Sequence, residues 1–166
     1  MAIVLVGGGG RSGKSRHALQ LARDCGPRLG FIATAQALDD EMRERTRLHQ
    51  HERGPDFLTI EEPVALAAAI ARYAAQVDAI VVDCLTLWLS NILSSDIESQ
   101  VSELIASSLA SPAQVIFVTN EVVCGIVPEN ALARRFRDCA GSLNQRVAEA
   151  ASEVYWMVFG CALRVK

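Results

Sequence analysis

A glycine-rich segment near the start of the chain constrains the fold more than any other feature. Residues 8–15 read GGGRSGKS, which fits the pattern G-x-x-x-x-G-K-[ST] of a phosphate-binding loop. The apolar residues 3–6 (IVLV) precede it and are typical of a buried strand, whereas Ala18 and Leu19 follow with helical spacing. Strand, loop and helix stand in the order that a phosphate loop requires. The motif therefore favours nucleotide binding over a plain glycine-rich turn.

Each residue type of the motif has a chemical role in the predicted loop. Glycines let backbone N–H groups turn toward an anionic phosphate, and the N-terminus of the following helix adds partial positive charge. Lys14 is expected to reach the β- and γ-phosphates, and the Ser15 hydroxyl is expected to bind Mg²⁺. The predicted phosphate contacts come from one continuous run: Gly8, Gly9, Gly10, Arg11, Ser12, Gly13, Lys14 and Ser15.

Composition limits the classes of protein to which the chain can belong. Its 166 residues suit one domain spanning 1–166, and a net charge of −3 argues against a general nucleic-acid surface. No apolar run approaches the length of a membrane span, so a cytoplasmic enzyme is expected. The five cysteines show no C-x-x-C spacing, which disfavours a zinc cluster or a disulfide framework.

The rest of the chain alternates between strand patterns and helix patterns, which predicts an α/β fold with a mostly parallel sheet. Further strands are expected over 30–35, 57–60, 79–83, 115–119, 154–159 and 162–165. Helices are expected over 39–52, over 63–76 with Pro63 at the first position, after a capping box at 95–98, and in a long segment containing Leu132, Phe136, Leu143 and Val147. The helix after the capping box is expected to bury Ile97, Val101, Leu104, Ile105 and Leu109.

Polar residues follow two of the predicted strands. Asp83 ends the apolar run 79–82, where a carboxylate can hold Mg²⁺ next to a phosphate loop, although an aspartate that caps a turn fits the same position. Asn120 and Glu121 end the next strand, on the side of an open α/β sheet where ligands bind. The guanine-reading motif N-K-x-D of switch GTPases would need lysine at position 121, so that class is disfavoured.

His49 and His51 lie two positions apart on the predicted helix 39–52, which is rich in charged residues. Successive residues of a helix point about 100° apart, so these two side chains cannot both face one site. An exposed helical histidine is by default a solvated side chain. A neutral imidazole is nevertheless nucleophilic, and it can attack a nucleotide α-phosphate to hold the nucleotide covalently. The residues alone leave both interpretations of His49 open.

Several segments together resemble one enzyme family. They include 8–15, 31–35 (FIATA), 38–42 (LDDEM), 83–91 (DCLTLWLSN), 118–122 (VTNEV) with 125–128 (GIVP), 135–138 (RFRD), 140–141 and 144–145. The chain resembles the bifunctional adenosylcobinamide kinase / adenosylcobinamide-phosphate guanylyltransferase family of cobalamin biosynthesis over nearly its whole length. The resemblance implies phosphorylation of adenosylcobinamide by GTP or ATP, then transfer of GMP from GTP to adenosylcobinamide phosphate. It also implies a RecA-like P-loop NTPase fold and a homotrimer.

The resemblance also implies roles for individual residues. It maps the guanylylated histidine to His49, which joins Lys14 of the phosphate loop as an expected catalytic residue. Ser15 and Asp83 remain the expected metal-binding residues on the grounds given above. Valine stands at position 123, where the family usually has glycine, so a positive φ there would be strained. Beyond the phosphate loop, the implied nucleotide contacts are Ala33, Thr34, Ala35, Gln50, His51, Glu52, Arg53, Glu61 and Asp83.

Two other functions fit the phosphate loop alone. One is a P-loop kinase for another small molecule, in which His49 is only a surface residue. The other is a nucleotide-binding regulatory subunit that hydrolyses slowly and acts through a change of shape. Only the bifunctional enzyme requires a covalent nucleotide on histidine.

Overall fold

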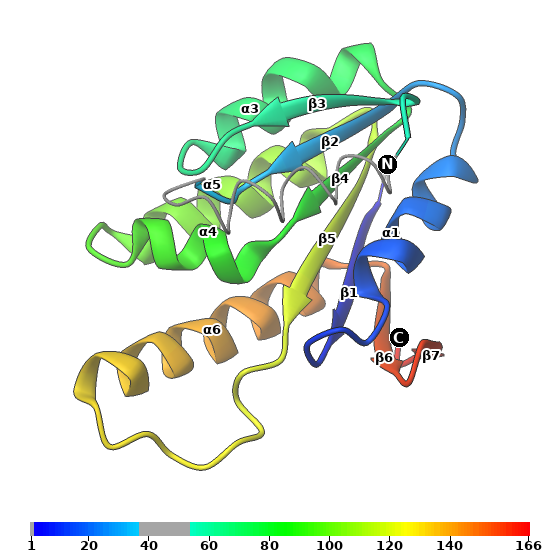
Figure 1. Cartoon of the computed structure of the whole chain (residues 1–166). Helices are drawn as coiled ribbons and strands as arrows, with labels where there is room; N and C mark the ends of the chain where they lie inside the picture. The colour runs from blue at the N-terminus through cyan, green and yellow to red at the C-terminus, as the bar shows by residue number, and fades with distance from the viewer. Residues whose placement is uncertain (1, 37–53) are drawn as a thin grey trace.

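The computed structural model describes residues 2–36 and 54–166, which form a seven-stranded sheet with helices on both faces (Figure 1). The strand order is β3-β2-β4-β5-β1-β6-β7. Neighbouring strands run parallel, except that β6 and β7 form an antiparallel hairpin. The strands are β1 (Ile3–Gly8), β2 (Leu29–Ala33), β3 (Phe57–Glu61), β4 (Ala79–Asp83), β5 (Gln114–Asn120), β6 (Glu153–Val158) and β7 (Cys161–Arg164).

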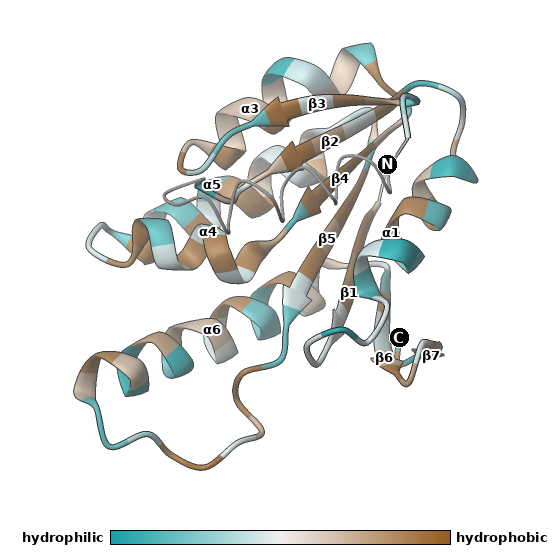
Figure 2. Ribbon diagram, viewed as in Figure 1, coloured by the Kyte–Doolittle hydropathy of each residue, from teal (hydrophilic) through white to brown (hydrophobic). Residues whose placement is uncertain are grey.

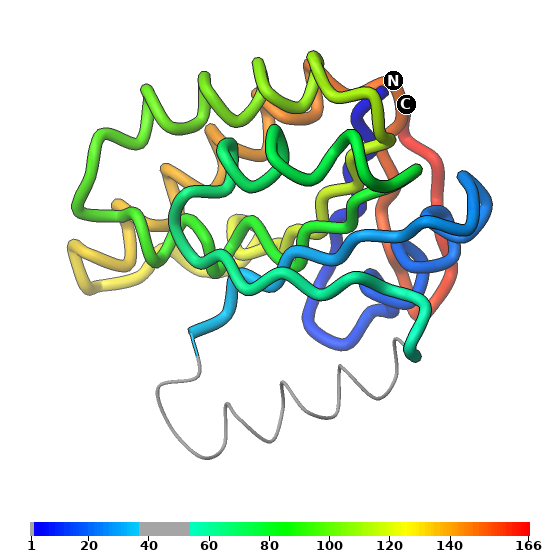
Figure 3. The backbone as a smooth tube through the Cα atoms, turned by 90° about the horizontal axis from the view of Figure 1, so that it is seen from above, coloured from blue at the N-terminus to red at the C-terminus, as the bar shows by residue number. Residues whose placement is uncertain are grey.

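The helices divide between the two faces of the sheet. Helix α1 packs on β1, β4 and β5 from one side. The other helices among the described residues cover the opposite side, where α3 and α5 lie against each other (Figures 1 and 3). In the part of the chain that the structure describes, no helix is long and apolar enough to cross a membrane. The helices are α1 (Lys14–Arg23), α3 (Leu66–Tyr73), the 3-10 helix η1 (Ala74–Gln76), α4 (Leu85–Ile92), α5 (Ile97–Ala110) and α6 (Ala131–Ala150).

The central strands are apolar throughout because helices bury both of their faces. In β4, Ala79 and Val81 join the core cluster beneath α1, while Ile80 and Val82 join the cluster beneath the other helices. All four side chains are fully buried. The hydropathy colouring shows the same pattern, with hydrophobic residues running along β4 and β5 (Figure 2).

The predicted start of the alanine-rich helix is wrong by three residues. Helix α3 begins at Leu66, not at Pro63. The side chain of Glu62 explains the difference, because its carboxylate accepts hydrogen bonds from the backbone N–H groups of Val64 (3.0 Å) and Ala65 (2.8 Å). These bonds hold the segment after Pro63 in a turn and delay the first helical residue.

The capping box predicted at 95–98 is also misplaced. Asp96, not Ser95, is the N-cap of α5, and its carboxylate accepts a hydrogen bond from the Ser99 N–H (3.2 Å). The Ser95 hydroxyl instead donates to the Ile92 carbonyl. Leu109, predicted as part of the buried stripe, is 53% exposed because α5 buries Ser108 in its last turns.

Two apolar residues that belong to predicted elements are exposed in the structure. Leu132 in the first turn of α6 is exposed, because that turn extends beyond the sheet. Phe159 does not extend β6 but lies in the turn to β7, with φ 51° and its side chain exposed.

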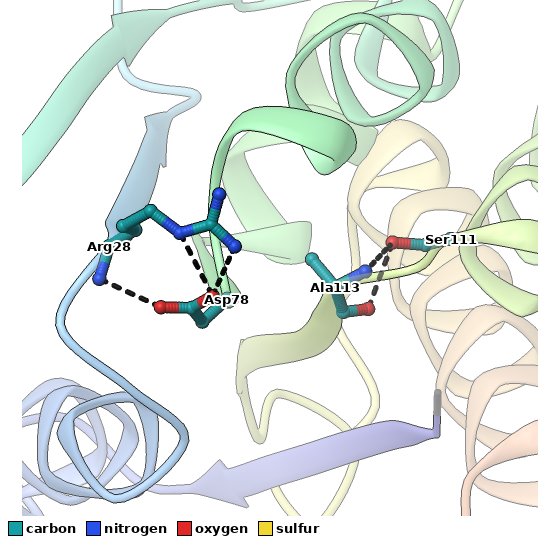
Figure 4. Close-up of polar contacts among 4 residues, drawn as sticks. All are labelled: Arg28, Asp78, Ser111 and Ala113. Carbon is teal, nitrogen blue, oxygen red and sulfur yellow. Dashed lines mark hydrogen bonds and ion pairs between the residues drawn. The ribbon is translucent and has the colours of Figure 1, made fainter.

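Polar contacts fasten the amino-terminal edge of the sheet, where β2 and β4 begin (Figure 4). The Asp78 carboxylate accepts hydrogen bonds from the Arg28 backbone N–H (2.9 Å) and from its guanidinium (2.5 Å). In the turn between α5 and β5, the Ser111 hydroxyl donates to the Ala113 carbonyl and accepts from the Ala113 N–H. These contacts lie at the opposite edge of the sheet from the phosphate loop.

We predict that Asp78→Asn destabilises the protein in a pH-dependent way. Hydrogen bonds from the Arg28 side chain hold the pKa of Asp78 below its usual value. A carboxylate with a lowered pKa in the folded state stabilises the protein above its unfolded-state pKa of about 3.9, and this contribution is lost as pH falls through the folded value. The variant should therefore melt below wild type at pH 7, and the difference should narrow as pH falls below about 4. Thermal unfolding between pH 7 and pH 3 measures this, with Asp56→Asn as a control at another exposed aspartate; a gap that does not change with pH would contradict the prediction.

Candidate active site

The predicted phosphate loop connects β1 to α1 at the carboxyl edge of the sheet. β1 ends at Gly8, and α1 begins at Lys14, with Gly13 as its N-cap at φ 95°. Arg11 at the tip of the loop also has a positive φ of 56°. Two residues in the left-handed region curl the chain within a few positions, so that backbone N–H groups of the loop can converge on an anion.

Gly8 is required by close packing at the entrance to the loop. A Cβ atom at this position would lie 2.8 Å from both the Met157 carbonyl oxygen and the Ser12 Oγ, on a backbone with φ 151°. A Cβ at Gly9 or Gly10 would meet no atom within 4 Å. The motif glycines therefore serve different purposes, and only some of them are needed to avoid a steric clash.

Lys14 is buried, with only 6% of its surface exposed, and its ammonium group lies inside the curve of the loop. Its Nζ donates a hydrogen bond to the Gly9 carbonyl at 2.5 Å. Burial lowers the pKa of Lys14, and the nearby Asp83 carboxylate partly offsets this effect. A cation held at this place can neutralise the β- and γ-phosphates of a bound nucleotide.

Ser15 and Asp83 meet across the sheet, as the sequence predicts for the two metal-binding positions. The Ser15 hydroxyl donates to the Asp83 Oδ2 at 2.6 Å. Hydroxyl and carboxylate oxygens suit Mg²⁺, which takes few protein ligands and keeps phosphate oxygens and water as the others. In residues 2–36 and 54–166, no group of three or more His, Cys, Asp or Glu side chains could hold a metal by itself. The chemistry of this donor pair therefore fits a magnesium ion bound together with a nucleotide.

Two more of the predicted nucleotide contacts, Ala33 and Glu61, lie in one row with Asp83 at this edge. Ala33 is paired in register with both Glu61 on β3 and Asp83 on β4. Glu61 is exposed and Ala33 is half-buried, so both have surface available to a ligand. Thr34, by contrast, is completely buried, and its hydroxyl is hydrogen-bonded to the main chain of Cys84.

Ala35, a further predicted contact, is half-buried just after β2. The other predicted contacts lie outside the described residues. They are the catalytic candidate His49 and the implied nucleotide contacts Gln50, His51, Glu52 and Arg53. Of the three histidines in the sequence, only His17 is described. It lies on α1 with its ring against the edge of Tyr155, at 4.9 Å between ring centroids, and burial lowers its pKa.

Asn120 and Glu121 end β5 beside the loop, on the predicted ligand side of the sheet. Asn120 is paired with Gly8, and the Glu121 N–H donates to the Gly8 carbonyl at 2.9 Å. The Glu121 carboxylate accepts from the N–H groups of Val123 and Cys124 and so caps the loop that follows. Val123 is not among the described residues with a positive φ, so the strain considered for valine at this position does not arise.

Sequence reasoning did not assign a role to three polar residues that organise this edge. The Thr86 hydroxyl accepts from the Asn120 N–H (2.8 Å), and the Thr119 hydroxyl donates to Asn144 Oδ1 (2.8 Å). The Asn91 side chain donates to the carbonyl of Thr34 (2.9 Å). Asn91 stands between the buried residues Leu89 and Ile92 in a mostly apolar helix (LTLWLSNI), and a polar side chain in such a setting is the signal that could have identified it.

Comparison with known proteins agrees with this geometry. The family model described as "Cobinamide kinase / cobinamide phosphate guanyltransferase" matches residues 4–165. The chain belongs to this family.

Characterised relatives match the chain over nearly its full length. The chain is 42% identical over 181 residues to the "Bifunctional adenosylcobalamin biosynthesis protein CobU" of Salmonella typhimurium, covering 99% of each chain. It is 41% identical over 166 residues to the corresponding protein CobP of Pseudomonas aeruginosa, covering 98% of this chain and 96% of the relative. It is also 39% identical to CobU of Escherichia coli over 181 residues, covering 99% of each chain.

A solved structure shares the fold at much lower sequence identity. The flagellar accessory protein FlaH from Methanocaldococcus jannaschii has a TM-score of 0.57 and 12% identity, covering 99% of this chain and 78% of that one. At this identity the likeness concerns the fold alone. Together with the mostly parallel sheet, it confirms the predicted α/β, RecA-like class.

We predict that Gly8→Ala disrupts the loop, whereas Gly10→Ala does not. The added methyl group at position 8 would collide with main chain that cannot move away, at a cost on the order of 1–3 kcal/mol of unfolding free energy. At position 10 the methyl group meets open space. Denaturant unfolding and GTP affinity measure the difference between the two variants. Equal stability and equal affinity in both would show that the packing around Gly8 is not required.

Proposed function

We propose that the chain is a bifunctional enzyme of cobalamin biosynthesis that carries out two successive transfers. The first phosphorylates the aminopropanol hydroxyl of adenosylcobinamide with GTP or ATP. The second transfers GMP from GTP to adenosylcobinamide phosphate, giving adenosylcobinamide-GDP and pyrophosphate. The family match over residues 4–165 is the observation that carries this proposal.

In the kinase step, the acceptor oxygen attacks the γ-phosphorus and the bond from that phosphorus to the β–γ bridging oxygen breaks. The nucleoside diphosphate leaves, and the hydroxyl proton passes to water. The loop 8–15 holds the triphosphate, and Lys14 balances the charge that develops on the bridging oxygen. Ser15 and Asp83 are the residues that would hold Mg²⁺. When bound, the ion neutralises phosphate charge and orients the triphosphate.

In the guanylyl transfer, a neutral imidazole attacks the α-phosphorus of GTP and releases pyrophosphate. The substrate phosphate then attacks the same phosphorus and frees the histidine, so one displacement is replaced by two. We assign the imidazole to His49. The assignment is supported by the resemblance and by the nucleophilicity of neutral histidine near pH 7.

The two alternatives, a kinase for another small molecule and a regulatory subunit, lack a comparable observation. Both are compatible with the phosphate loop. Neither accounts for the full-length match to relatives named as bifunctional adenosylcobalamin biosynthesis proteins.

We predict that the protein becomes labelled when it is incubated with Mg²⁺ and GTP carrying a radioactive α-phosphate. A phosphoramidate should survive denaturation in base and be lost in acid. His49→Ala should abolish the label, and Lys14→Ala should also abolish it because the triphosphate is no longer held. His17→Gln should keep the label, since His17 packs against Tyr155. An unlabelled wild type that still phosphorylates adenosylcobinamide would reduce the function to the kinase half.

We further propose that the enzyme is a single-domain homotrimer. The resemblance supports this assembly, and the β6–β7 hairpin carries exposed apolar side chains, Phe159 and Leu163 among them, that an interface would bury. Light scattering after gel filtration should give three times the mass of the 17.9 kDa chain. A monomeric mass at micromolar concentration would refute the trimer while leaving the assignment of the loop intact.

A further inference from the structure

We infer that Thr34 is a positioning residue, which acts on the bound metal–nucleotide complex by holding Asp83 in place. The resemblance places Thr34 among the nucleotide contacts. Its side chain, however, has 0% exposure and therefore no surface to offer a nucleotide. The inference rests on the proposed function in one respect, namely that Ser15 and Asp83 hold Mg²⁺ with the nucleotide.

The hydroxyl of Thr34 clamps the chain on the far side of Asp83. Its Oγ1 donates to the Cys84 carbonyl at 2.8 Å and accepts from the Cys84 N–H at 2.8 Å. The Thr34 backbone N–H donates to the Asp83 carbonyl at 3.2 Å. The regular pairing of β2 with β4 ends at Ala33 and Asp83, so these bonds continue it by one residue through a side chain. As a result, the main chain is held at Asp83 and at the residue that follows it.

Thr34 is itself fixed from the opposite side. The Asn91 Nδ2 on α4 donates to the Thr34 carbonyl at 2.9 Å and to the Pro63 carbonyl at 2.9 Å. One helix residue therefore ties the end of β2 to the segment that follows β3. This arrangement joins the position of the Asp83 main chain to the helix layer of the fold.

The hydrogen bonds between Thr34 and Cys84 bear on metal binding because the neighbouring Asp83 makes a short contact with the end of the phosphate loop. Its Oδ2 lies 2.6 Å from the Ser15 Oγ. Metal sites demand ligand positions accurate to about 0.5 Å, and residues that orient the ligands typically change metal affinity about 10- to 100-fold when they are replaced. Valine has nearly the shape of threonine, but it would leave the Cys84 N–H and carbonyl without their partner. Asp83 could then relax away from Ser15.

The test measures the coupling between metal and nucleotide instead of turnover. Calorimetry gives the Kd of a non-hydrolysable GTP analogue with Mg²⁺ and with EDTA, and the Kd in EDTA divided by the Kd with Mg²⁺ is the metal coupling. Thr34→Val should lower this ratio about 10-fold or more while leaving the Kd in EDTA within about two-fold. Thr34→Ser keeps the hydroxyl and should restore the wild-type ratio.

A matched control separates positioning from general stability. Ser108 is a buried hydroxyl on α5 that donates to the Leu104 carbonyl. Ser108→Ala should lower the melting temperature without changing the metal coupling. If Thr34→Val does not fold, Asn91→Ala replaces it, because that variant frees the Thr34 carbonyl while keeping the hydroxyl contacts; it should show an intermediate coupling.

The outcomes distinguish this inference from the proposed function. Full coupling in Thr34→Val, or in Asn91→Ala where that variant is used, would overturn the positioning role while leaving the metal site in place. A reduced ratio that Thr34→Ser fails to restore would also overturn it. Absence of any Mg²⁺ effect in wild type would instead refute the metal site of the proposed function, and the positioning role with it.

Discussion

Burial of the parallel sheet on both faces is the constraint on which the rest of the structure depends. Parallel strands can be joined only by crossovers, so the carboxyl ends of β1, β2, β3, β4 and β5 all meet at one edge. Helices cover the two faces of the sheet, so the carboxyl edge is where a ligand can bind. The phosphate loop, Asp83 and Glu61 share that edge although they are far apart in the sequence.

The sequence predicted this framework well because its signals are local and repeated. An uninterrupted apolar run such as 79–82 can be stable only when it is covered on both sides, and a glycine-rich loop with this spacing between a strand and a helix is typical of phosphate binding. The helix starts were less predictable. Pro63 fits a first helical position and Ser95 fits an N-cap, but in each case the side chain of a neighbouring residue set the start of the helix in competition with them. Glu62 accepts hydrogen bonds from the Val64 and Ala65 N–H groups and delays α3, and Asp96 caps α5 through the Ser99 N–H. Such competition depends on side-chain geometry that spacing does not specify.

In the candidate site, too, some features could be predicted from the sequence and others could not. The meeting of Ser15 and Asp83 followed from a motif and from the end of a strand. The burial of Thr34 did not, because the sequence shows only that a small polar residue follows a strand. Its hydroxyl contacts Cys84, fifty positions away in the chain, and that pairing exists only once β2 lies beside β4. Residue type can indicate that a position lies near the chemistry, but whether it contacts the ligand or supports another residue is decided by packing.

The described framework also bears on where the nucleophile for guanylyl transfer originates. The chain has three histidines, and His17 lies on α1 against Tyr155, with its pKa lowered by burial and no hydrogen-bond partner for Nε2 among the described residues. It therefore packs in the framework beside β6. The histidine nucleophile that we propose for guanylyl transfer lies in the segment between β2 and β3, which holds His49 and His51. The end of β2, from which that segment continues, is held at Thr34 directly beside Asp83, so the residue that we infer to position the metal ligand also anchors the start of the segment that holds the proposed nucleophile. The two proposed transfers would thus use the same edge of the sheet. They would differ in the nucleophile, which is the acceptor hydroxyl at the γ-phosphorus in one and the imidazole at the α-phosphorus in the other.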